Sequence, residues 1–221
     1  MTSKKKINII GAGGHSRPII EVLNAHFKNR KKFIYDLNFK KKKSKEKILG
    51  CNVVGSLNDF LKEKNTEVYL AIGDNNLRMQ IFKKLKKLKI KLPNLISNDA
   101  SMSKFFNIGV GNFINKQAFI GPDVIIGNNN IINTRSVLEH QTTLGSNSHI
   151  GPKSIIGGHV KIGNNVLIGL GSKVINNVKI CNNCIIGAGS VVTKNINKPG
   201  TYVGIPAKKI KTKSALKKKK F

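Results

Sequence analysis

The second half of the chain places a medium-sized apolar residue at every sixth position. The series is Ile96, Met102, Ile108, Ile114, Ile120, Ile126, Ile132, Leu138, Leu144, Ile150, Ile156, Ile162, Ile168, Val174, Ile180, Ile186 and Val192. Neither the 3.6-residue period of a helix nor the two-residue alternation of a strand produces this spacing. The segment is therefore an internal repeat of its own kind.

A second series accompanies the first, because a small or β-branched residue stands four positions after most of these apolar residues. Its members are Ala118, Val124, Ser136, Thr142, Ser148, Ser154, Val160, Val166, Ser172, Val178, Cys184 and Ser190. Short strands with a turn at every sixth residue predict a triangular parallel β-helix, in which Gly and Asn occupy tight turns with positive φ. At about 18 residues per coil, residues from 96 to about 195 form five to six coils.

The first half alternates strands with helices. A short apolar strand leads into the glycine turn at 11–14 and then into an amphipathic helix, with Pro18 in its first turn. A second strand is predicted at 31–38, a third at 67–73 and a helix at 76–89. This order predicts a small parallel α/β domain at 1–93, a β-helix at 94–212 and a basic tail at 213–221.

The stretch "GAGGHS" at 11–16 follows a strand and opens a helix, which is typical of a phosphate or nucleotide loop. Ser16 stands where the third glycine of a dinucleotide motif would be, and a domain of about 90 residues is closer to one mononucleotide half than to a full dinucleotide fold. A nucleotide or nucleotide sugar is therefore expected instead of NAD, and a merely tight turn is the alternative. Asp36 ends the second strand, where an acid can bind ribose hydroxyls, and Gly73 ends the third strand at the same edge. His15 could hydrogen-bond this ligand or cap the helix.

The β-helix segment contains few acids, yet Glu139 and His140 are adjacent. Glu139 is the only acid between Asp123 and the C-terminus. A carboxylate beside an imidazole is the pairing used for a general base, so His140 is the candidate base and Glu139 its partner. His149 lies half a coil away on another face, so two chains of an oligomer would have to bring these histidines together, and His159 lies nearly above His140.

The chain has 40 Lys and Arg but 10 Asp and Glu, a formal net charge of +30. The lysines are spread over both halves and aromatic residues make up 6%, so we expect no nucleic-acid partner; the basic surface suits polyanionic small molecules. There is no apolar run long enough for a membrane span, and the start is expected to be a first strand and not a signal peptide. Cys51, Cys181 and Cys184 form no metal set and are expected to pack as free thiols in the cytoplasm.

Three stretches together resemble a known family: "IIGAGGHS" at 9–16, "INTRSVLEHQTTLGSNSHIGP" at 132–152 and "GAGSVVTKNINKPGTYVGIPAKKI" at 187–210. They are similar to the bacterial sugar acetyltransferases of the NeuD/PglD type. The resemblance implies a Rossmann-like N-terminal domain, a left-handed parallel β-helix and a homotrimer with active sites between subunits. It also implies acetyl-CoA as donor, a nucleotide-linked amino sugar or sialic acid as acceptor, and a role in surface glycan biosynthesis.

The same resemblance implies roles for particular residues. His140 would be the catalytic base, and His149 would contact acetyl-CoA. The Gly158 amide would lie near the acetyl carbonyl as an oxyanion donor. Coenzyme A would be lined or covered by Leu170, Ala188, Pro206 and Lys208. The nucleotide-sugar pocket would contain Gly13, Gly14, His15, Tyr35, Asp36 and Gly73.

The sequence departs from the family pattern at two positions. Gln141 stands where an acid is common, so Glu139 is expected to orient His140 instead, and Tyr35 also replaces a common acid. The expected reaction is direct acetyl transfer to an amine, without a metal. Three alternatives are sialic acid O-acetylation, a non-catalytic nucleotide-sugar binding protein, and a zinc site at interfacial histidines that hydrates carbon dioxide.

Overall fold

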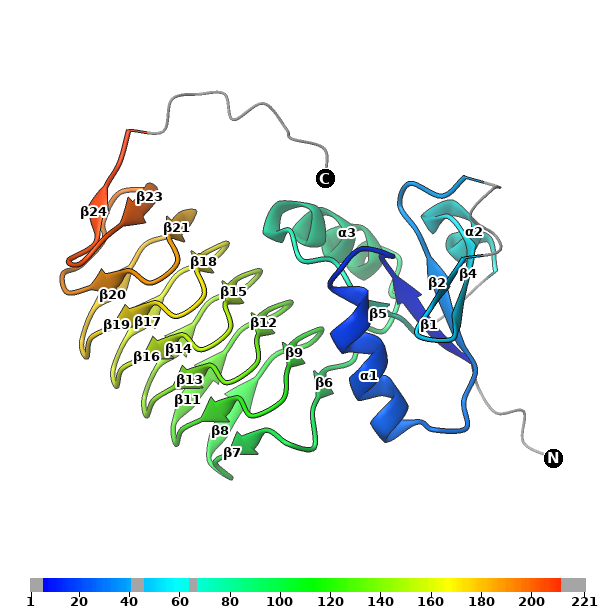
Figure 1. The fold of residues 1–221 in the computed structure, drawn as a ribbon, viewed down its shortest axis with the longest axis horizontal. Coiled ribbons are helices and arrows are strands. Elements are labelled where there is room, and N and C mark those ends of the chain that lie inside the picture. Colours follow the sequence, from blue (N-terminus) through cyan, green and yellow to red (C-terminus); the bar gives the residue numbers. More distant parts are fainter. Residues whose placement is uncertain (1–5, 41–45, 64–66, 212–221) are drawn as a thin grey trace.

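A computed structural model describes residues 6–40, 46–63 and 67–211. The basic tail expected at 213–221 lies outside the described residues, as does part of the lysine-rich loop that follows the second strand. Figure 1 shows a small α/β domain beside a regular stack of coils. No helix within the described ranges is long and apolar enough to cross a membrane.

The N-terminal domain is built on a five-stranded sheet in the order β3-β4-β2-β1-β5. The strands are β1 (Ile7–Ile10), β2 (Lys32–Tyr35), β3 (Lys47–Ile48), β4 (Cys51–Gly55) and β5 (Tyr69–Leu70), and all neighbours are parallel except β3 and β4. The helices are α1 (Ser16–His26), α2 (Leu57–Lys62) and α3 (Asn75–Lys87). Side chains of α1 pack in one apolar cluster, while α2 and α3 contribute to another.

The sequence analysis missed β3, β4 and α2. The expected third strand at 67–73 is the fifth strand and covers two residues, because the chain from Ala71 onward is the loop that carries Gly73. A local signal for α2 was present: Ser56 caps the helix and Asp59 completes a capping box. The residues of β4 are alternately buried and exposed, but the sequence does not show this alternation, because the buried Val53 and the exposed Val54 are both apolar.

The second domain is a left-handed parallel β-helix with three sheets. The sheets are β7-β10-β13-β16-β19-β22, β8-β11-β14-β17-β20, and β6-β9-β12-β15-β18-β21-β23-β24. The strands are β6 (Leu95–Ile96), β7 (Ser101–Met102), β8 (Phe106–Ile108), β9 (Phe113–Ile114), β10 (Phe119–Ile120), β11 (Val124–Ile126), β12 (Ile131–Ile132), β13 (Val137–Leu138), β14 (Thr143–Leu144), β15 (His149–Ile150), β16 (Ile155–Ile156), β17 (Lys161–Ile162), β18 (Leu167–Ile168), β19 (Lys173–Val174), β20 (Lys179–Ile180), β21 (Cys184–Ile186), β22 (Val191–Val192), β23 (Gly200–Val203) and β24 (Lys208–Lys209).

The six-residue register is confirmed in detail. From Ile114 onward every apolar residue of the first series is buried, and so is every member of the second series. The turns repeat with the same period, because residues such as Asn129, Gln141 and Asn165 take the left-handed conformation with φ between 55° and 58°. Six strands in the first sheet correspond to six coils, the upper end of the prediction.

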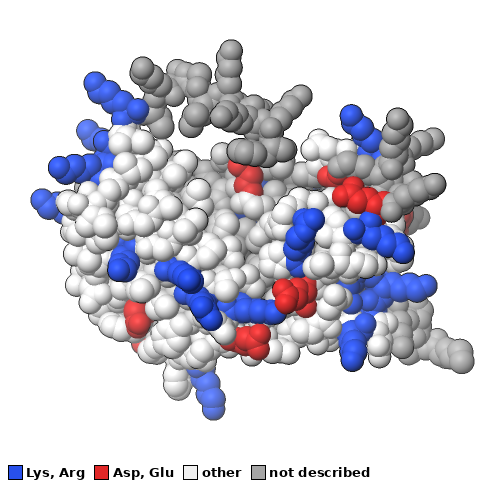
Figure 2. All heavy atoms as spheres, in the orientation of Figure 1, with Lys and Arg blue, Asp and Glu red and all other residues white. Residues whose placement is uncertain are grey.

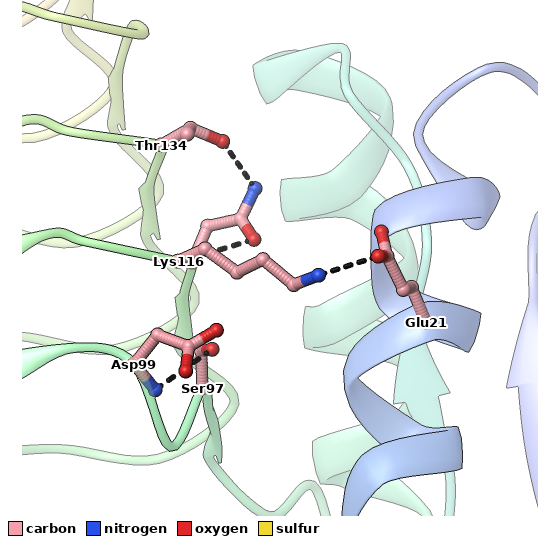
Figure 3. Close-up of polar contacts among 6 residues, drawn as sticks. Glu21, Ser97, Asp99, Lys116 and Thr134 are labelled. Carbon is pink, nitrogen blue, oxygen red and sulfur yellow. Dashed lines mark hydrogen bonds and ion pairs between the residues drawn. The ribbon is translucent and has the colours of Figure 1, made fainter.

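The N-terminal domain packs against one face of the β-helix, the sheet that contains β6, β9, β12 and β15; we call it the domain face. Its outward residues Leu95, Phe113 and Ile131 belong to the same apolar cluster as α1 and β1. At the edge of this contact Lys116 pairs with Glu21 of α1 (Figure 3). The other two sheets leave Ile125 and Ile155 about half exposed, at 50% and 43%.

Candidate functional site

The carboxyl edge of the N-terminal sheet forms a cavity of about 510 Å³, which we call the acceptor cavity. Its walls include the glycine turn, Asp36 and Gly73, so the structure brings together the groups expected at this edge. A Cβ at Gly13 or Gly14 would meet no atom, so the turn is open there. No backbone hydrogen bond within the described chain uses the N–H groups of Gly13, Gly14 or His15. These amides could bind an anion.

The glycine that the turn requires is Gly11, which the sequence analysis did not select. Its φ of 113° is a backbone conformation that residues with a side chain rarely adopt, and a Cβ would come within 2.6 Å of the Ala71 carbonyl oxygen. Gly11 therefore allows β1 and the loop after β5 to approach closely. Both Gly11 and Ala71 line the acceptor cavity.

His15 is half-buried beside the acceptor cavity and does not cap the helix through its side chain. It stands at the N-cap of α1, but its side chain makes no capping hydrogen bond. Its Nε2 is buried without a hydrogen-bond partner in the described structure. Burial, followed by the charges of His149 and Arg78, lowers the pKa of His15 to about 3, so the ring is neutral at physiological pH.

Asp36 and Tyr35 are separated by the pleat of β2. Asp36 lines the acceptor cavity and accepts a hydrogen bond from the Asn38 N–H at 3.2 Å. Tyr35 is 1% exposed and points into the opposite layer, where its hydroxyl donates to Glu63 at 2.8 Å. The resemblance placed Tyr35 in the nucleotide-sugar pocket, and for its side chain this was wrong, because neighbouring strand residues face opposite sides of a sheet.

A second cavity, of about 640 Å³, lies between the start of α3 and the domain face; we call it the junction cavity. Its walls include Gly73, His149, Leu167 and Ile185. Gly73 lines both cavities, and the rings of His15 and His149 lie 6.2 Å apart at the boundary. The acceptor cavity and the β-helix therefore meet at His149.

His149 is neutral, and its proton can be assigned. The Asn133 amide nitrogen lies 3.1 Å from His149 Nε2, so Nε2 accepts this hydrogen bond. Nδ1 then carries the proton, in agreement with a backbone hydrogen bond to Gly73. Burial, followed by the charge of Arg78, lowers the pKa of His149 to about 4, although the bond to Gly73 opposes this. Both ring nitrogens of His149 are hydrogen-bonded within the chain. A coenzyme would therefore contact the flat face of the ring by van der Waals packing and not by a hydrogen bond.

His140 is exposed on a corner of the β-helix that we call the His140 corner, formed by the stacked turns 121–123, 139–141, 157–159 and 175–177. Its Nδ1 lies 3.1 Å from the Gln141 side-chain oxygen, and its ring meets that of His159 edge-on at 5.2 Å. No hydrogen bond joins Glu139 to His140 in the described chain, so the orienting role expected of Glu139 stays a prediction. Gln141 makes that contact instead.

Gly158 lies directly under the His140 ring. A Cβ at this position would come within 2.6 Å of the ring atoms Cε1 and Nε2, so only glycine leaves room for the imidazole. The Gly158 N–H already donates to the Asn176 side-chain oxygen at 3.1 Å. The structure thus gives Gly158 a steric role and does not leave its amide free as the expected oxyanion donor.

The remaining coenzyme candidates lie on exposed parts of the β-helix. Leu170, which is 62% exposed, and Ala188 stack on the corner that follows the domain face. Pro206 follows a cis peptide bond after Ile205 in the exposed segment between β23 and β24, and Lys208 begins β24. None of the four touches either cavity described above.

Two family models match the chain. The PglD N-terminal domain matches residues 6–85, and the bacterial transferase hexapeptide of six repeats matches 123–158, 141–172 and 159–194. PerB from Caulobacter crescentus, solved with CoA and GDP-perosamine, is 32% identical over 94% of this chain and 98% of its own, with a TM-score of 0.85. This chain belongs to the hexapeptide-repeat sugar acetyltransferases of the PglD/NeuD type. It is an acetyl-CoA-dependent sugar N-acetyltransferase.

Other solved structures share the fold along almost the whole acetyltransferase. The acetyltransferase domain of PglB from Neisseria gonorrhoeae, solved with acetyl coenzyme A, is 27% identical with a TM-score of 0.87, covering 94% of this chain and 100% of its own. WeeI from Acinetobacter baumannii is 22% identical with a TM-score of 0.85, covering 93% and 99%. The comparison with curated protein sequences found no match.

Several residues around the acetyltransferase's cavities escaped the sequence analysis. Asn38 and Leu77 line the acceptor cavity, and Asn165 and Asn183 line the junction cavity. The two asparagines were visible only as turn residues of the repeat. The start of α3 carried a clearer signal, since Asp74 caps the helix and directly follows Gly73.

The two half-buried neutral histidines, His15 and His149, should make the acetyltransferase less stable in acid. An unfolded histidine has a pKa near 6.5, whereas His149 folded has one of about 4, so the unfolded state binds protons first as the pH falls. The free energy of unfolding is therefore complete above pH 6.5 and decreases below it. At about 1.4 kcal/mol per pKa unit, His149 alone accounts for about 3 kcal/mol by pH 4.

Urea midpoints between pH 7 and pH 4 measure this effect. His149→Gln should flatten the dependence on pH, and His159→Asn should not, because His159 is exposed and Asn tolerates its φ of 58°. Equal slopes for the wild type and His149→Gln would contradict the assignment.

Proposed function

We propose that the protein transfers the acetyl group of acetyl-CoA to the amino group of a nucleotide-linked 4-amino sugar, for bacterial surface glycan biosynthesis in the cytoplasm. The observation that carries this proposal is the acceptor cavity, where free amides at Gly13 and Gly14 can bind phosphate and Asp36 can bind ribose. The relative PerB was solved with a nucleotide-linked amino sugar and CoA, which supports this class of acceptor.

His140 is the general base of this proposal. With Nδ1–H donating to Gln141, the lone pair of Nε2 is free to accept the proton of the attacking amine. The amine nitrogen bonds to the thioester carbonyl carbon, the carbon–sulfur bond breaks, and the coenzyme leaves as a thiolate that takes up a proton. Gln141 is a neutral acceptor, so it stabilises the imidazolium less than a carboxylate would.

The site requires more than one copy of the chain. In the triangular β-helix the His140 corner lies between the two sheets that do not contact the N-terminal domain, opposite the domain face. His140 therefore points away from the acceptor cavity of its own chain. Exposed apolar residues surround this corner, with Phe105 at 73%, Ile175 at 46% and Ile155 at 43% exposure. Such a patch is typical of a subunit interface.

We infer a homotrimer, in which the His140 corner of one subunit faces the cavities of its neighbour. Light scattering should give three times the 24.3 kDa mass of the chain. Phe105→Glu should shift the protein to smaller species and remove activity together. An active monomer at micromolar concentration would refute the shared site.

His140→Ala tests the reaction most directly. Its turnover number should fall about 10²–10⁴-fold, the usual contribution of a general base, with the Michaelis constant for acetyl-CoA nearly unchanged. His159→Asn is the matched control, because it removes the neighbouring ring and keeps the turn. Release of CoA thiol in the presence of GDP-perosamine and UDP-linked 4-amino sugars is the measurement. A folded His140→Ala protein with the wild-type rate would reject the assignment.

Asp36→Ala tests the acceptor cavity separately from the donor. Loss of a ribose contact should raise the Michaelis constant for the nucleotide sugar and leave that for acetyl-CoA nearly constant. Asp36→Asn serves as control for the loop, because an amide oxygen can still accept from Asn38. If free sialic acid were the best acceptor, the reaction would be O-acetylation, with His140 acting on a hydroxyl.

A further inference from the structure

Arg78 is 1% exposed and lies in the first turns of α3, where the two domains meet. A guanidinium carries five N–H groups, and here each of them has an acceptor. Nε donates to Asn129 O at 3.2 Å; Nη1 to Ile72 O at 3.2 Å and Gly73 O at 3.1 Å; and Nη2 to Asn75 Oδ1 at 2.7 Å and Ser148 O at 3.1 Å. The side chain is therefore fully hydrogen-bonded.

These acceptors come from parts of the chain that the site must hold together. Ile72 and Gly73 form the loop after β5, and Gly73 lines both cavities. Asn129 belongs to a turn of the β-helix between β11 and β12, and Ser148 directly precedes His149 of β15. One planar group thus connects the loop of the acceptor cavity to the strand that carries His149.

The contact differs from the exposed pair between Lys116 and Glu21 shown in Figure 3. Surface ion pairs contribute little to stability. Arg78 forms no ion pair with a carboxylate in the described chain; Asp74 acts on it only through its charge, and burial lowers its pKa to about 10, so it remains charged. A buried charge without an ion-pair partner is a poor means of stabilisation, which favours a role in geometry.

Lys32 is also buried, but its ammonium group donates to Phe27 O and Arg30 O, which both belong to the N-terminal domain. Most other basic side chains are exposed. On the face seen in Figure 2 they are scattered over both domains. Arg78 is also one of the charges that keep His15 and His149 neutral. Its position therefore affects both the geometry and the protonation of the boundary between the cavities.

We propose that Arg78 is a positioning residue, which holds Gly73 and the acceptor cavity in register with His149 and the β-helix. Its loss would displace the sugar amine from the thioester and from the neighbouring subunit's His140. This inference rests on the proposed function, although Arg78 itself touches neither substrate. A displacement of about 1 Å can cost about 10²-fold in rate.

Three variants test the proposal: Arg78→Lys, which keeps the charge but not the planar set of donors; Arg78→Ala, which leaves a space for an added ion; and Lys83→Met, an exposed control on the same helix. With GDP-perosamine and acetyl-CoA, Arg78→Lys and Arg78→Ala should lower the turnover number about 10²-fold. The Michaelis constant for acetyl-CoA and the oligomeric mass should stay unchanged. Millimolar guanidinium, but not sodium at equal ionic strength, should restore part of the activity of Arg78→Ala.

Wild-type turnover in both folded Arg78 variants would overturn the proposal. Loss of the folded state in both, without rescue by guanidinium, would also overturn it, since Arg78 would then act on stability alone. If the wild type acetylates no nucleotide amino sugar, the proposed function fails. Hydrogen exchange then tests Arg78 independently. The loop at 72–75 is flanked by two bonded amides, since the Ala71 N–H donates to Ile10 O and the Leu77 N–H donates to Asp74 Oδ1. Both amides should exchange at least about tenfold faster in Arg78→Lys and at the wild-type rate in Lys83→Met. Equal exchange in all three proteins would refute it.

Discussion

The packing of the N-terminal domain on one face of a triangular β-helix is the constraint on which the other features depend. It buries Leu95, Phe113 and Ile131 of the β-helix in the same cluster as α1 and β1. Since a triangular prism has three faces, the opposite corner is left in solvent, and that corner carries His140. The separation of the acceptor cavity from the candidate base follows from this geometry and not from any single residue.

The same packing explains the unusual polar groups at the domain boundary. His15, His149 and Arg78 are removed from water there, and burial is the first cause of the lowered pKa of each. Hydrogen bonds offset much of this cost for His149 and Arg78, whose polar atoms are paired. His15 is the exception, because its buried Nε2 has no partner in the described chain. The residue itself lines the acceptor cavity.

The β-helix contributes rigidity where the chemistry needs it. Each turn of the His140 corner is held by backbone bonds between coils, such as His159 N–H to His140 O at 3.0 Å. Glycine at 158 leaves room for the ring above it, and the left-handed φ at Gln141 is part of the turn that places its amide oxygen beside Nδ1. The turns of the β-helix therefore hold the candidate base in place, although Gln141 stands at the position where the family commonly has an acid.

The sequence by itself determined the β-helix almost completely, because the apolar residue at every sixth position predicts which side chain points inward. It also determined the nature of the acceptor edge, since a glycine turn after β1 and Asp36 after β2 must meet at the carboxyl ends of parallel strands. Only the tertiary structure decided the side on which Tyr35 faces, the partner of His140 and the use of the Gly158 amide. It alone revealed Arg78, because the acceptors of this arginine are distant in sequence, and no local pattern encodes a contact between domains.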